Sequence, residues 1–504
     1  MPPLWLIGMM GAGKSTAGRL LAVQRGVEHV DVDGLIESAS GKSIAELFES
    51  EGEEAFRRRE AAAVSSITAR NDSIVSTGGG AVLDPANVAH MRSTGVVVLL
   101  NASVPSLERR VGSGHSRPLL AEEVAGVQLE ALWESRAADY EAAAHFAVDA
   151  DQAVTDVVDV VAGCARFTIS DDSFVVVGPV LPRQLLPPSD RREQAVVIAQ
   201  PGSISVARAV MAQLEAEVDA IALIEVPDRE EAKTLDVMGK MYETLAELNV
   251  GRHDTIVGVG GGTITDVAGF GAATWLRGIE WVSVPTTLLG AVDAAIGGKT
   301  GINVRGKNLV GAFWHAAQIS ISLGVLDALP TEAVREGAAE AIKAGFIADP
   351  TIVTLYDKHG LDAPSAEVVR RAVAVKAAVV SEDFREQGRR ALLNFGHTIG
   401  HGIEIHLGMP HGHAVAVGMV AAAAVSAARY GFDAERVQAP LERLGLPTSA
   451  PTADATAVRE FVSRDKKRTS DGLRMVLLRD IGDPVLEHVR DEEIDLGLAA
   501  VGVS

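Results

Sequence analysis

The chain has 504 residues, of which 47% are hydrophobic and 22% charged, a composition typical of globular proteins with large cores. Its formal net charge of −21 excludes a general binder of nucleic acid or of anionic membrane surfaces, because polyanions would be repelled. The single cysteine, Cys164, excludes an intrachain disulfide, and the N-terminus lacks the basic region and long apolar core of a signal peptide. These features predict a cytoplasmic protein with no membrane segment, in which the apolar run 414–428 is a buried helix.

The first third of the chain alternates between predicted strands and helices. Short apolar runs predict strands at 4–7, 73–76 and 96–100. A helix is expected over 14–23, directly after the first strand, and the run 157–161 is expected to close the last helix of this part. Such alternation predicts a parallel sheet with flanking helices, and we expect residues 164–173 to form a junction.

After the junction the alternation restarts and then gives way to helices. Apolar runs predict strands at 195–199, 220–226 and 255–259. A helix is expected over 233–249, between the second and third of these strands. Beyond residue 326, Ala-rich amphipathic segments such as 365–380 and 414–430 predict an all-helical unit. We therefore expect three domains, at 1–166, 170–325 and 326–504.

The segment from Gly8 to Ser15, GMMGAGKS, fits the P-loop pattern and lies between a predicted strand and a predicted helix. Its glycines let backbone N–H groups surround phosphate oxygens, and the helix N-terminus adds a positive dipole. In such a loop Lys14 reaches the β- and γ-phosphates, and the Ser15 hydroxyl binds Mg²⁺. A chance glycine-rich turn is the alternative, and the strand–loop–helix context disfavours it. We predict nucleotide contacts from Gly11, Gly13, Lys14, Ser15 and Thr16.

Further motifs of the N-terminal part follow in a definite order. They are Asp31-Val32-Asp33, the segment 52–60, Gly78-Gly79-Gly80, and the segments 117–120 and 136–140. In this order the motifs of residues 1–166 resemble those of shikimate kinase. The resemblance implies a P-loop kinase domain that transfers a phosphoryl group from ATP to shikimate.

The same resemblance implies roles on the phosphate side of the site. Asp31 is expected to help hold Mg²⁺, and Asp33 to bind the shikimate hydroxyls and act as the base. Arg117 is expected to lie on a mobile lid and to steady the transferring phosphoryl group. The family often places an adenine-stacking Arg near the end of this domain, which this chain lacks, so adenine is expected to contact Arg110 and Pro118.

On the acceptor side, the resemblance implies that Arg57 and Arg136 clamp the shikimate carboxylate. A fork-shaped guanidinium suits a planar carboxylate, so the chemistry agrees with the assignment. Gly79 and Gly80 are expected to approach the ring. Any one of these arginines could be a solvated surface residue, and the ordered set of motifs argues against that alternative.

A glycine cluster, Gly258 to Gly262, follows the predicted strand at 255–259. It is not a clean GxGxxG, so it is a weak dinucleotide signal, and a tight strand-to-helix turn is the alternative. Later motifs add to it, at 266–270, 277–278, 285–289, 292–293, 297–303, 306–308, 340–343, 394–401, 411–412 and 465–467. In this order they resemble 3-dehydroquinate synthase over residues 170–504.

This second resemblance implies an NAD-dependent enzyme with a strongly cationic substrate site. The implied NAD contacts are Glu230, Lys233, Gly260, Gly261, Gly262, Asp266, Thr286, Thr287 and Lys307. The implied substrate contacts are Arg277, Asn308, Lys343, Lys376, Arg390, Asn394 and Lys466, with catalytic roles for Asp293, Lys299 and His401. So many cations in an acidic protein suit a substrate with a carboxylate and a phosphate.

By the same match Glu340, His397 and His411 are expected to bind Zn²⁺ or Co²⁺. One Glu with two His residues is a catalytic zinc set that leaves open positions for substrate oxygens. His401 lies one helical turn after His397, so both could bind one ion, although the resemblance places His401 on the substrate side. His413 is interpreted as a neighbour of the site rather than a ligand.

Together the resemblances imply an α/β fold class: a P-loop kinase domain, a Rossmann-like α/β NAD domain and an all-helical C-terminal domain. They imply a bifunctional shikimate-pathway enzyme. One reaction is the ATP-dependent 3-phosphorylation of shikimate. The other is the NAD- and metal-dependent conversion of 3-deoxy-D-arabino-heptulosonate 7-phosphate to 3-dehydroquinate with release of phosphate. The expected assembly is a homodimer through the synthase part.

Two other functions stay open at this point. The C-terminal part could be a metal-dependent polyol dehydrogenase, which would release NADH and no phosphate. The chain could also be a non-catalytic, nucleotide-gated binding protein in which one domain has decayed. The presence of Lys14, Asp33, Glu340, His397 and His411 argues against decay.

Overall fold

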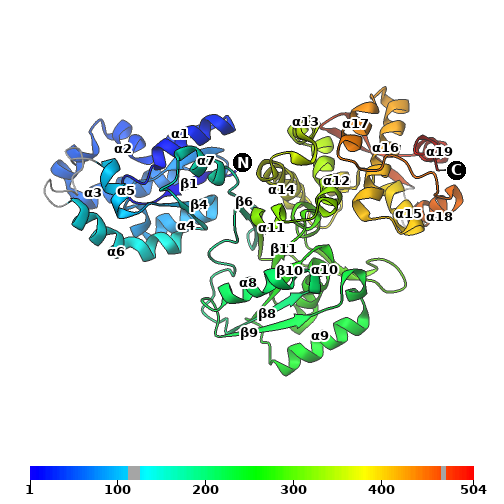
Figure 1. Ribbon diagram of the computed structural model, residues 1–504, viewed down its shortest axis with the longest axis horizontal. Helices are drawn as coiled ribbons and strands as arrows, with labels where there is room; N and C mark the ends of the chain where they lie inside the picture. The colour runs from blue at the N-terminus through cyan, green and yellow to red at the C-terminus, as the bar shows by residue number, and fades with distance from the viewer. Residues whose placement is uncertain (112–124, 467–472, 504) are drawn as a thin grey trace. The chain divides into compact units, whose positions relative to one another are not determined.

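The structure is a computed structural model that describes residues 1–111, 125–466 and 473–503, without the side chains of residues 125–128 and 463–466. By its internal contacts the chain forms two compact units. The first comprises Met1–Phe167 and Val176–Leu185, and the second comprises Thr168–Val175 and Leu186–Ser504. Figure 1 shows both units with their elements labelled.

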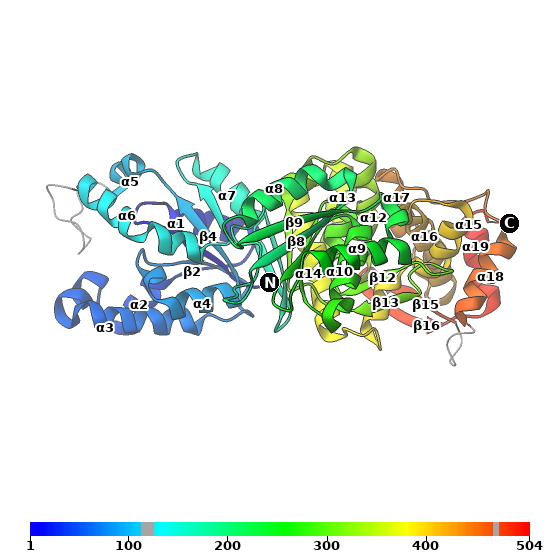
Figure 2. The same cartoon turned by 90° about the horizontal axis from the view of Figure 1, so that it is seen from below.

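The first unit contains a parallel sheet flanked by helices, which agrees with the prediction. The strand order is β2-β3-β1-β4-β5, and all neighbouring strands are parallel. The strands are β1 (Leu4–Ile7), β2 (Glu28–Asp31), β3 (Ser73–Ser76), β4 (Val96–Asn101) and β5 (Phe146–Asp149). The helices are α1 (Lys14–Arg25), α2 (Val32–Ser40), α3 (Ile44–Ser66), α4 (Pro85–Thr94), α5 (Val104–Val111), α6 (Ala125–Ala143) and α7 (Val154–Ala162). Helices α1 and α7 pack side by side on one face of the sheet, and α4 lies on the other (Figures 1 and 2).

The connection from β1 to α1 is a loop whose shape requires glycine. Gly8, Gly11 and Gly13 have φ values of 140°, 81° and 95°, in the region that L side chains rarely adopt. A Cβ atom on Gly8 would also lie 2.6 Å from the carbonyl oxygen of Leu100. Gly13 is the N-cap of α1, and no side chain caps the first N–H groups of this helix. The loop therefore directs uncapped N–H groups toward the space above β1, as an anion site needs.

The second unit contains β14, β11, β10, β8 and β9 of a seven-stranded sheet, whose order is β6-β7-β14-β11-β10-β8-β9. The strands of this sheet are β6 (Ala165–Ser170), β7 (Ser173–Gly178), β8 (Gln194–Ala199), β9 (Ala220–Glu225), β10 (Thr255–Gly260), β11 (Glu280–Pro285) and β14 (Gln318–Ser322). The helices between them are α8 (Ile204–Leu214), α9 (Leu235–Glu247) and α10 (Gly262–Thr274). Strand β12 (Lys299–Ile302) pairs with β13 (Val310–Phe313) in a hairpin beside α10 (Figure 2).

Two predicted elements of this region differ from the structure at their ends. The helix expected from residue 233 begins at Leu235, because the Thr234 side chain caps it by accepting a hydrogen bond from the Val237 N–H at 3.3 Å. The expected junction at residues 164–173 contains strand β6. After it the chain returns to the first unit over residues 176–185. There the Arg183 N–H donates to the His145 carbonyl at 2.9 Å, and Arg92 donates to the Gln184 side chain at 2.9 Å.

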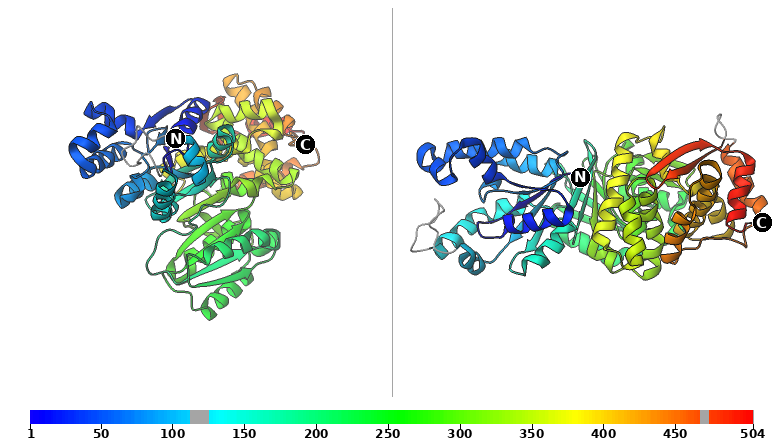
Figure 3. Two further views of the ribbon diagram at one scale, coloured as in Figure 1. Left: turned by 60° about the vertical axis from the view of Figure 1, so that its left-hand side comes forward. Right: turned by 90° about the horizontal axis from the view of Figure 1, so that it is seen from above.

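The C-terminal region is helical, with one addition to the all-helical prediction. Its helices are α11 (Leu323–Asp327), α12 (Thr331–Ile347), α13 (Pro350–His359), α14 (Ser365–Glu382), α15 (His397–Leu407), α16 (His411–Tyr430), α17 (Glu435–Arg443), α18 (Ala455–Lys466) and α19 (Asp491–Ala500). The addition is an antiparallel hairpin of β15 (Arg474–Asp480) and β16 (Asp483–His488), drawn in red beside the orange helices in Figure 3. Its Leu478 N–H donates to the Ser426 hydroxyl of α16 at 3.0 Å, so the hairpin depends on a tertiary contact.

Helix α16 is the one helix among the described residues that is long and apolar enough to cross a membrane. Of its most apolar window, 72% is buried inside the structure, which confirms the prediction of a buried helix at 414–428. Glycines let its neighbours pack closely. A Cβ atom on Gly412 would lie 2.1 Å from the Glu336 carbonyl oxygen of α12, and one on Gly418 would lie 1.9 Å from the Gly396 carbonyl oxygen beside α15. Backbone-to-backbone packing therefore brings α12, α15 and α16 together at one point.

Candidate active sites

A cavity of about 600 Å³ opens at the P-loop of the first unit. The residues predicted for the nucleotide and acceptor sites line it: Gly11, Gly13, Lys14, Ser15, Thr16, Asp31, Asp33, Arg57, Gly79, Gly80, Arg110 and Arg136. Arg117 and Pro118, predicted for the lid and for adenine, lie outside the described residues. The structure thus brings together groups from six separate segments of the sequence.

At one end of this cavity the charged groups suit a phosphate with a metal ion. Lys14 Nζ is buried and donates to the carbonyl oxygens of Gly8 and Met9 at 2.7 and 2.9 Å. The Ser15 hydroxyl donates to Asp31 Oδ2 at 2.8 Å. A hydroxyl and a carboxylate side by side are hard oxygen donors, which Mg²⁺ prefers.

At the other end two arginines face a glycine segment. Arg57 pairs with Glu60 at 2.7 Å, and Arg136 donates to the Gly79 carbonyl at 3.4 Å. A Cβ atom on Gly80 would lie 2.3 Å from Arg57 Nη1, so a larger residue would displace the guanidinium. Burial raises the pKa of Glu60, although Arg57 opposes the shift. Sequence reasoning gave no role to Glu60, although its position three residues after Arg57 places both on one helical face.

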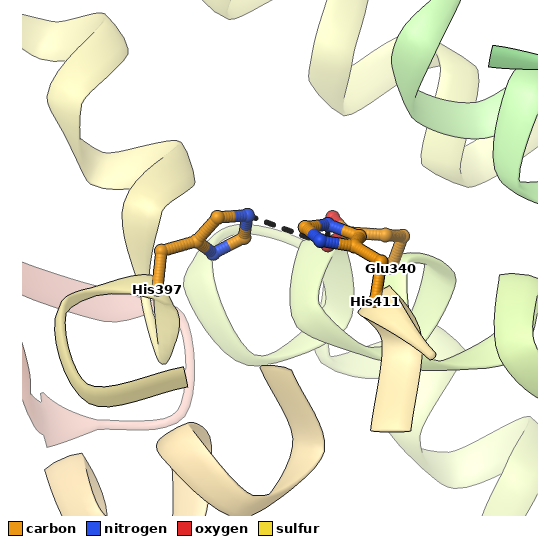
Figure 4. Close-up of side chains that lie close together, drawn as sticks. All are labelled: Glu340, His397 and His411. Atoms are coloured by element: carbon orange, nitrogen blue, oxygen red, sulfur yellow. Dashed lines mark ion pairs between the residues drawn. The ribbon is translucent and has the colours of Figure 1, made fainter. Parts of the chain in front are cut away.

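In the second unit, three predicted ligands converge from three helices (Figure 4). Glu340 belongs to α12, whereas His397 and His411 are the first residues of α15 and α16. Glu340 Oε1 lies 3.6 Å from His397 Nε2 and 3.4 Å from His411 Nε2, and the three ligand atoms all lie within 4.8 Å of one another. Ligands of a tetrahedral zinc ion at the usual bond lengths are about 3.4 Å apart. The donor set therefore fits Zn²⁺ or Co²⁺ in composition and spacing.

The charges around this set favour the metal-binding forms of Glu340 and His397. Burial opposes ionisation of Glu340, but its ion pair with Lys343 and the nearby imidazoles lower the pKa of Glu340 well below its usual value. Burial and Lys343 lower the pKa of His397 well below its usual value, which keeps this imidazole neutral. Burial and the neighbouring His411 lower the pKa of His401 to about 4.

Several predicted substrate groups lie near Glu340, His397 and His411, which we call the metal set. Lys376 lies 2.5 Å from Asp293 Oδ1, and Lys343 lies 3.9 Å from the same oxygen. A cavity of about 340 Å³ beside the set is lined by Lys299, Asn394, His397 and His401 among others. Arg390 is buried and donates to the carbonyl oxygens of Phe384 and Gly297 at 2.5 and 2.9 Å.

Glu386 also lines this cavity, and sequence reasoning missed it. It forms an ion pair with Lys299 and accepts a hydrogen bond from Asn394 at 3.0 Å. A carboxylate that pairs with a predicted substrate lysine has no sequence signal of its own, because its partner lies 87 residues away.

The predicted NAD residues gather at the start of α10. Gly261 is the N-cap of this helix, and the Thr286 N–H donates to the Gly260 carbonyl at 3.0 Å. Lys233 forms two ion pairs, one of them with Asp266 of α10. Lys233 lies 2.6 Å from Asp266 and 3.2 Å from Glu230.

The remaining NAD-side residues connect to this group or to α15. A Cβ atom on Gly261 would lie 3.2 Å from Thr287 Cγ2, so the glycine segment and the loop after β11 approach closely. Lys233 Nζ donates to Asn308 at 3.4 Å, which places this predicted substrate residue on the NAD side. Lys307 forms an ion pair with Glu404 of α15.

Three predicted or neighbouring residues lie apart from these clusters. Arg277 is exposed and has no ion pair with a described residue. Lys466 ends α18, and its side chain lies outside the described residues. His413 Nε2 lies 3.1 Å from Glu332, and within the described chain it belongs to neither group of possible metal ligands.

Comparisons with known proteins match both parts of the chain. The family model "Shikimate kinase" matches residues 10–164, and the models "3-dehydroquinate synthase N-terminal" and "3-dehydroquinate synthase C-terminal" match residues 223–336 and 337–468. The 3-dehydroquinate synthase of Corynebacterium diphtheriae is 44% identical over 314 residues, which cover 60% of this chain and 88% of that protein. That of Mycobacterium leprae is 43% identical over 322 residues, or 62% of this chain and 89% of that protein.

Two solved structures are similar to the second part. A 2-deoxy-scyllo-inosose synthase complexed with carbaglucose-6-phosphate, NAD⁺ and Co²⁺ matches with a TM-score of 0.57 and 28% identity, over 63% of this chain and 93% of that one. The 2-epi-5-epi-valiolone synthase of Streptomyces hygroscopicus, with NAD⁺ and Zn²⁺ bound, matches with a TM-score of 0.59 and 28% identity, over 66% of this chain and 97% of that one.

Proposed function

Because the chain belongs to the 3-dehydroquinate synthase family and carries a shikimate kinase domain in the same polypeptide, we propose a residue-level account of two reactions. In it residues 1–166 phosphorylate shikimate at its 3-hydroxyl with ATP. Residues 170–325 and 326–504 together convert 3-deoxy-D-arabino-heptulosonate 7-phosphate to 3-dehydroquinate. The observation that carries the synthase assignment is the convergence of Glu340, His397 and His411 at ligand distances.

In the kinase domain each end of the P-loop cavity performs one task. Ser15 and Asp31 provide oxygen ligands for the Mg²⁺ that accompanies ATP, and Lys14 balances charge on the transferring phosphoryl group. Asp33 lines the same cavity and accepts the proton of the attacking hydroxyl. Arg57 and Arg136 hold the shikimate carboxylate, while Arg110 contacts adenine and Arg117 steadies the phosphoryl group.

In the synthase part Glu340, His397 and His411 hold Zn²⁺ or Co²⁺. When bound, the ion supplies a Lewis acid, and NAD supplies a hydride acceptor that is regenerated in each turnover. Residues of this chain bind and orient the substrate anions: Arg277, Lys299, Asn308, Lys343, Lys376, Arg390, Asn394 and Lys466. Asp293 and His401 lie beside the metal set, where they can move protons during loss of phosphate.

The NAD cofactor is held at the start of α10 in this proposal. The N-terminus of α10, with the glycines at 260–262, faces the pyrophosphate, as helix N-termini do in other dinucleotide sites. Glu230, Lys233, Asp266, Thr286, Thr287 and Lys307 complete the NAD contacts. We place the enzyme in the cytoplasm as a homodimer through its synthase part, and analytical ultracentrifugation of the full chain tests the dimer.

Two assays on the purified full chain test the account. One measures ATP-dependent phosphorylation of shikimate, and the other measures NAD-dependent release of phosphate from 3-deoxy-D-arabino-heptulosonate 7-phosphate. Both activities are expected. Net formation of NADH without phosphate would instead identify a polyol dehydrogenase. Loss of one activity in a folded wild-type chain would identify a domain that has decayed.

A further inference from the structure

A second group of possible ligands adjoins the metal set. The ligand atoms of His401, Glu404 and His411 also lie within 4.8 Å of one another, so His411 belongs to both groups. Its two ring nitrogens face different carboxylates. Nε2 lies 3.4 Å from Glu340 Oε1, and Nδ1 lies 3.1 Å from Glu404 Oε2.

The two contacts of Glu404 decide between a second metal site and a supporting role. An ionised carboxylate accepts hydrogen bonds and cannot donate them, so the contact requires the ring proton of His411 on Nδ1. The ring nitrogen left for a metal ion is then Nε2, which faces Glu340. The other oxygen of Glu404 is in an ion pair with Lys307, which balances its charge. Both oxygens of Glu404 therefore already have partners, and His411 offers only one lone pair.

The positions of these residues show how Glu404 reaches His411. His397, His401 and Glu404 occupy positions i, i+4 and i+7 of α15, which lie on one face of the helix. His411 is instead the first residue of α16, directly after the N-cap Pro410, so it does not share that helical face. The Glu404 side chain is only 11% exposed, so its surroundings restrict it and it can hold the His411 ring in one rotamer.

We propose that Glu404 is a positioning residue, which holds His411 through Nδ1 so that Nε2 is directed at the metal. The proposal rests on the metal role of Glu340, His397 and His411 given above. It also connects the metal set to Lys307 on the NAD side, through one carboxylate. Outer partners of this kind typically contribute 10- to 100-fold to metal affinity.

The test uses the full chain, freed of metal by chelation and titrated with Co²⁺. Glu404→Ala removes the acceptor, whereas Glu404→Gln keeps an oxygen that can accept from Nδ1. Glu332→Gln is the matched control, because Glu332 faces the neighbouring His413 at 3.1 Å. We expect Glu404→Ala to raise the Kd for Co²⁺ by about 10- to 100-fold and to change the visible Co²⁺ absorption spectrum. Glu404→Gln should restore most of the affinity, and the control should match wild type.

Thermal unfolding of the metal-free proteins shows that each variant is folded. A Glu404→Ala chain that binds Co²⁺ with the wild-type Kd and spectrum would overturn the positioning role alone. So would a Glu404→Gln chain as weak as Glu404→Ala, because a hydrogen-bond acceptor would then not be the property that matters. A wild-type chain that does not bind Co²⁺ would overturn the metal site itself and the proposal with it.

Discussion

Lys376 Nζ lies 2.5 Å from Asp293 Oδ1, although 83 residues separate the two in the sequence. Lys343 lies 3.9 Å from the same oxygen. Burial opposes ionisation of Asp293, but the two lysines outweigh it and lower the pKa of this carboxyl. Asp293 is therefore the shared counter-ion of two buried ammonium groups next to the metal set.

Substitution Asp293→Asn should damage the synthase and spare the kinase. It leaves Lys343 and Lys376 without their common counter-ion, which costs about 3 kcal/mol of stability in comparable buried pairs. The displaced lysines should lower kcat/KM for phosphate release by about 100-fold. Asp349→Asn is the control, because Asp349 forms an ion pair at 3.0 Å with Arg371, which lies on α14 as Lys376 does. Unchanged phosphate release in a folded Asp293→Asn chain would refute the catalytic assignment.

Lys14→Met should abolish the kinase reaction alone. Removing the ammonium group from the P-loop takes away charge stabilisation of the transferring phosphoryl group, so kcat should fall by about 100- to 1000-fold. Phosphate release at the second site should be near normal, which a parallel assay measures. Lys42→Met serves as control, since Lys42 pairs with Glu51 on the surface of the same unit. Loss of both activities in a folded Lys14→Met protein would argue against two separate sites.

The two reactions should respond to different metal ions. A chelator should stop phosphate release, and Zn²⁺ or Co²⁺ but not Mg²⁺ should restore it, because imidazole ligands suit softer ions than Mg²⁺. His411→Ala should lower metal content and synthase activity together and leave shikimate phosphorylation intact. His413→Ala should retain metal, because this ring faces Glu332. The opposite pattern, with metal lost only in His413→Ala, would show that the third ligand is wrongly assigned.

Residues 176–185 should stabilise the kinase unit. This segment supplies the Gln184 side chain that accepts from Arg92 and the Arg183 N–H that donates to the His145 carbonyl. Both fragments, 1–168 and 1–186, are expected to phosphorylate shikimate, but the shorter one should unfold at a lower temperature. Calorimetry of the two fragments measures the difference. Equal melting temperatures would show that the returning segment contributes nothing to the unit.

The first unit should lose stability below neutral pH through His145. Its Nδ1 accepts the Val97 N–H at 3.0 Å, and burial, with Arg92 and Arg166 nearby, lowers the pKa of His145 well below 6.5. The unfolded chain therefore binds this proton first. The stability from the neutral ring is complete above the unfolded pKa and declines by about 1.4 kcal/mol per pH unit as the pH falls below it.

His145→Asn tests this pH dependence, because Asn keeps an acceptor for the Val97 N–H and does not titrate. Calorimetry of the full chain between pH 7 and pH 5 should show a smaller decline for the variant. Added shikimate identifies the kinase transition, since a ligand raises the melting temperature of the unit that binds it. Parallel declines in both proteins would exclude His145 as the source.

The sequence by itself predicted six of the twelve strands in the two larger sheets. Strands β1, β3, β4, β8, β9 and β10 agree with the predicted runs to within a residue at each end, because a buried parallel strand is a short apolar run that carries its own signal. The hairpin β15–β16 was not predicted. One of its backbone N–H groups, that of Leu478, donates to the Ser426 hydroxyl of helix α16, a tertiary contact that the local sequence does not show. Likewise the return of residues 176–185 to the first unit depends on Arg92 and His145, which lie far back in the chain.

The candidate sites divide in the same way. Ordered motifs in the sequence predicted which residue types would bind phosphate, cofactor and metal, because those chemistries require Lys, Gly, Glu and His at definite local spacings. Only the tertiary structure decided their partners. The fold pairs three carboxylates with predicted site residues that the sequence did not connect to them. These are Glu60 with Arg57, Glu386 with Lys299, and Glu404 with His411. A carboxylate becomes a counter-ion or an anchor through the group it faces, and that group is set by helix packing rather than by local sequence.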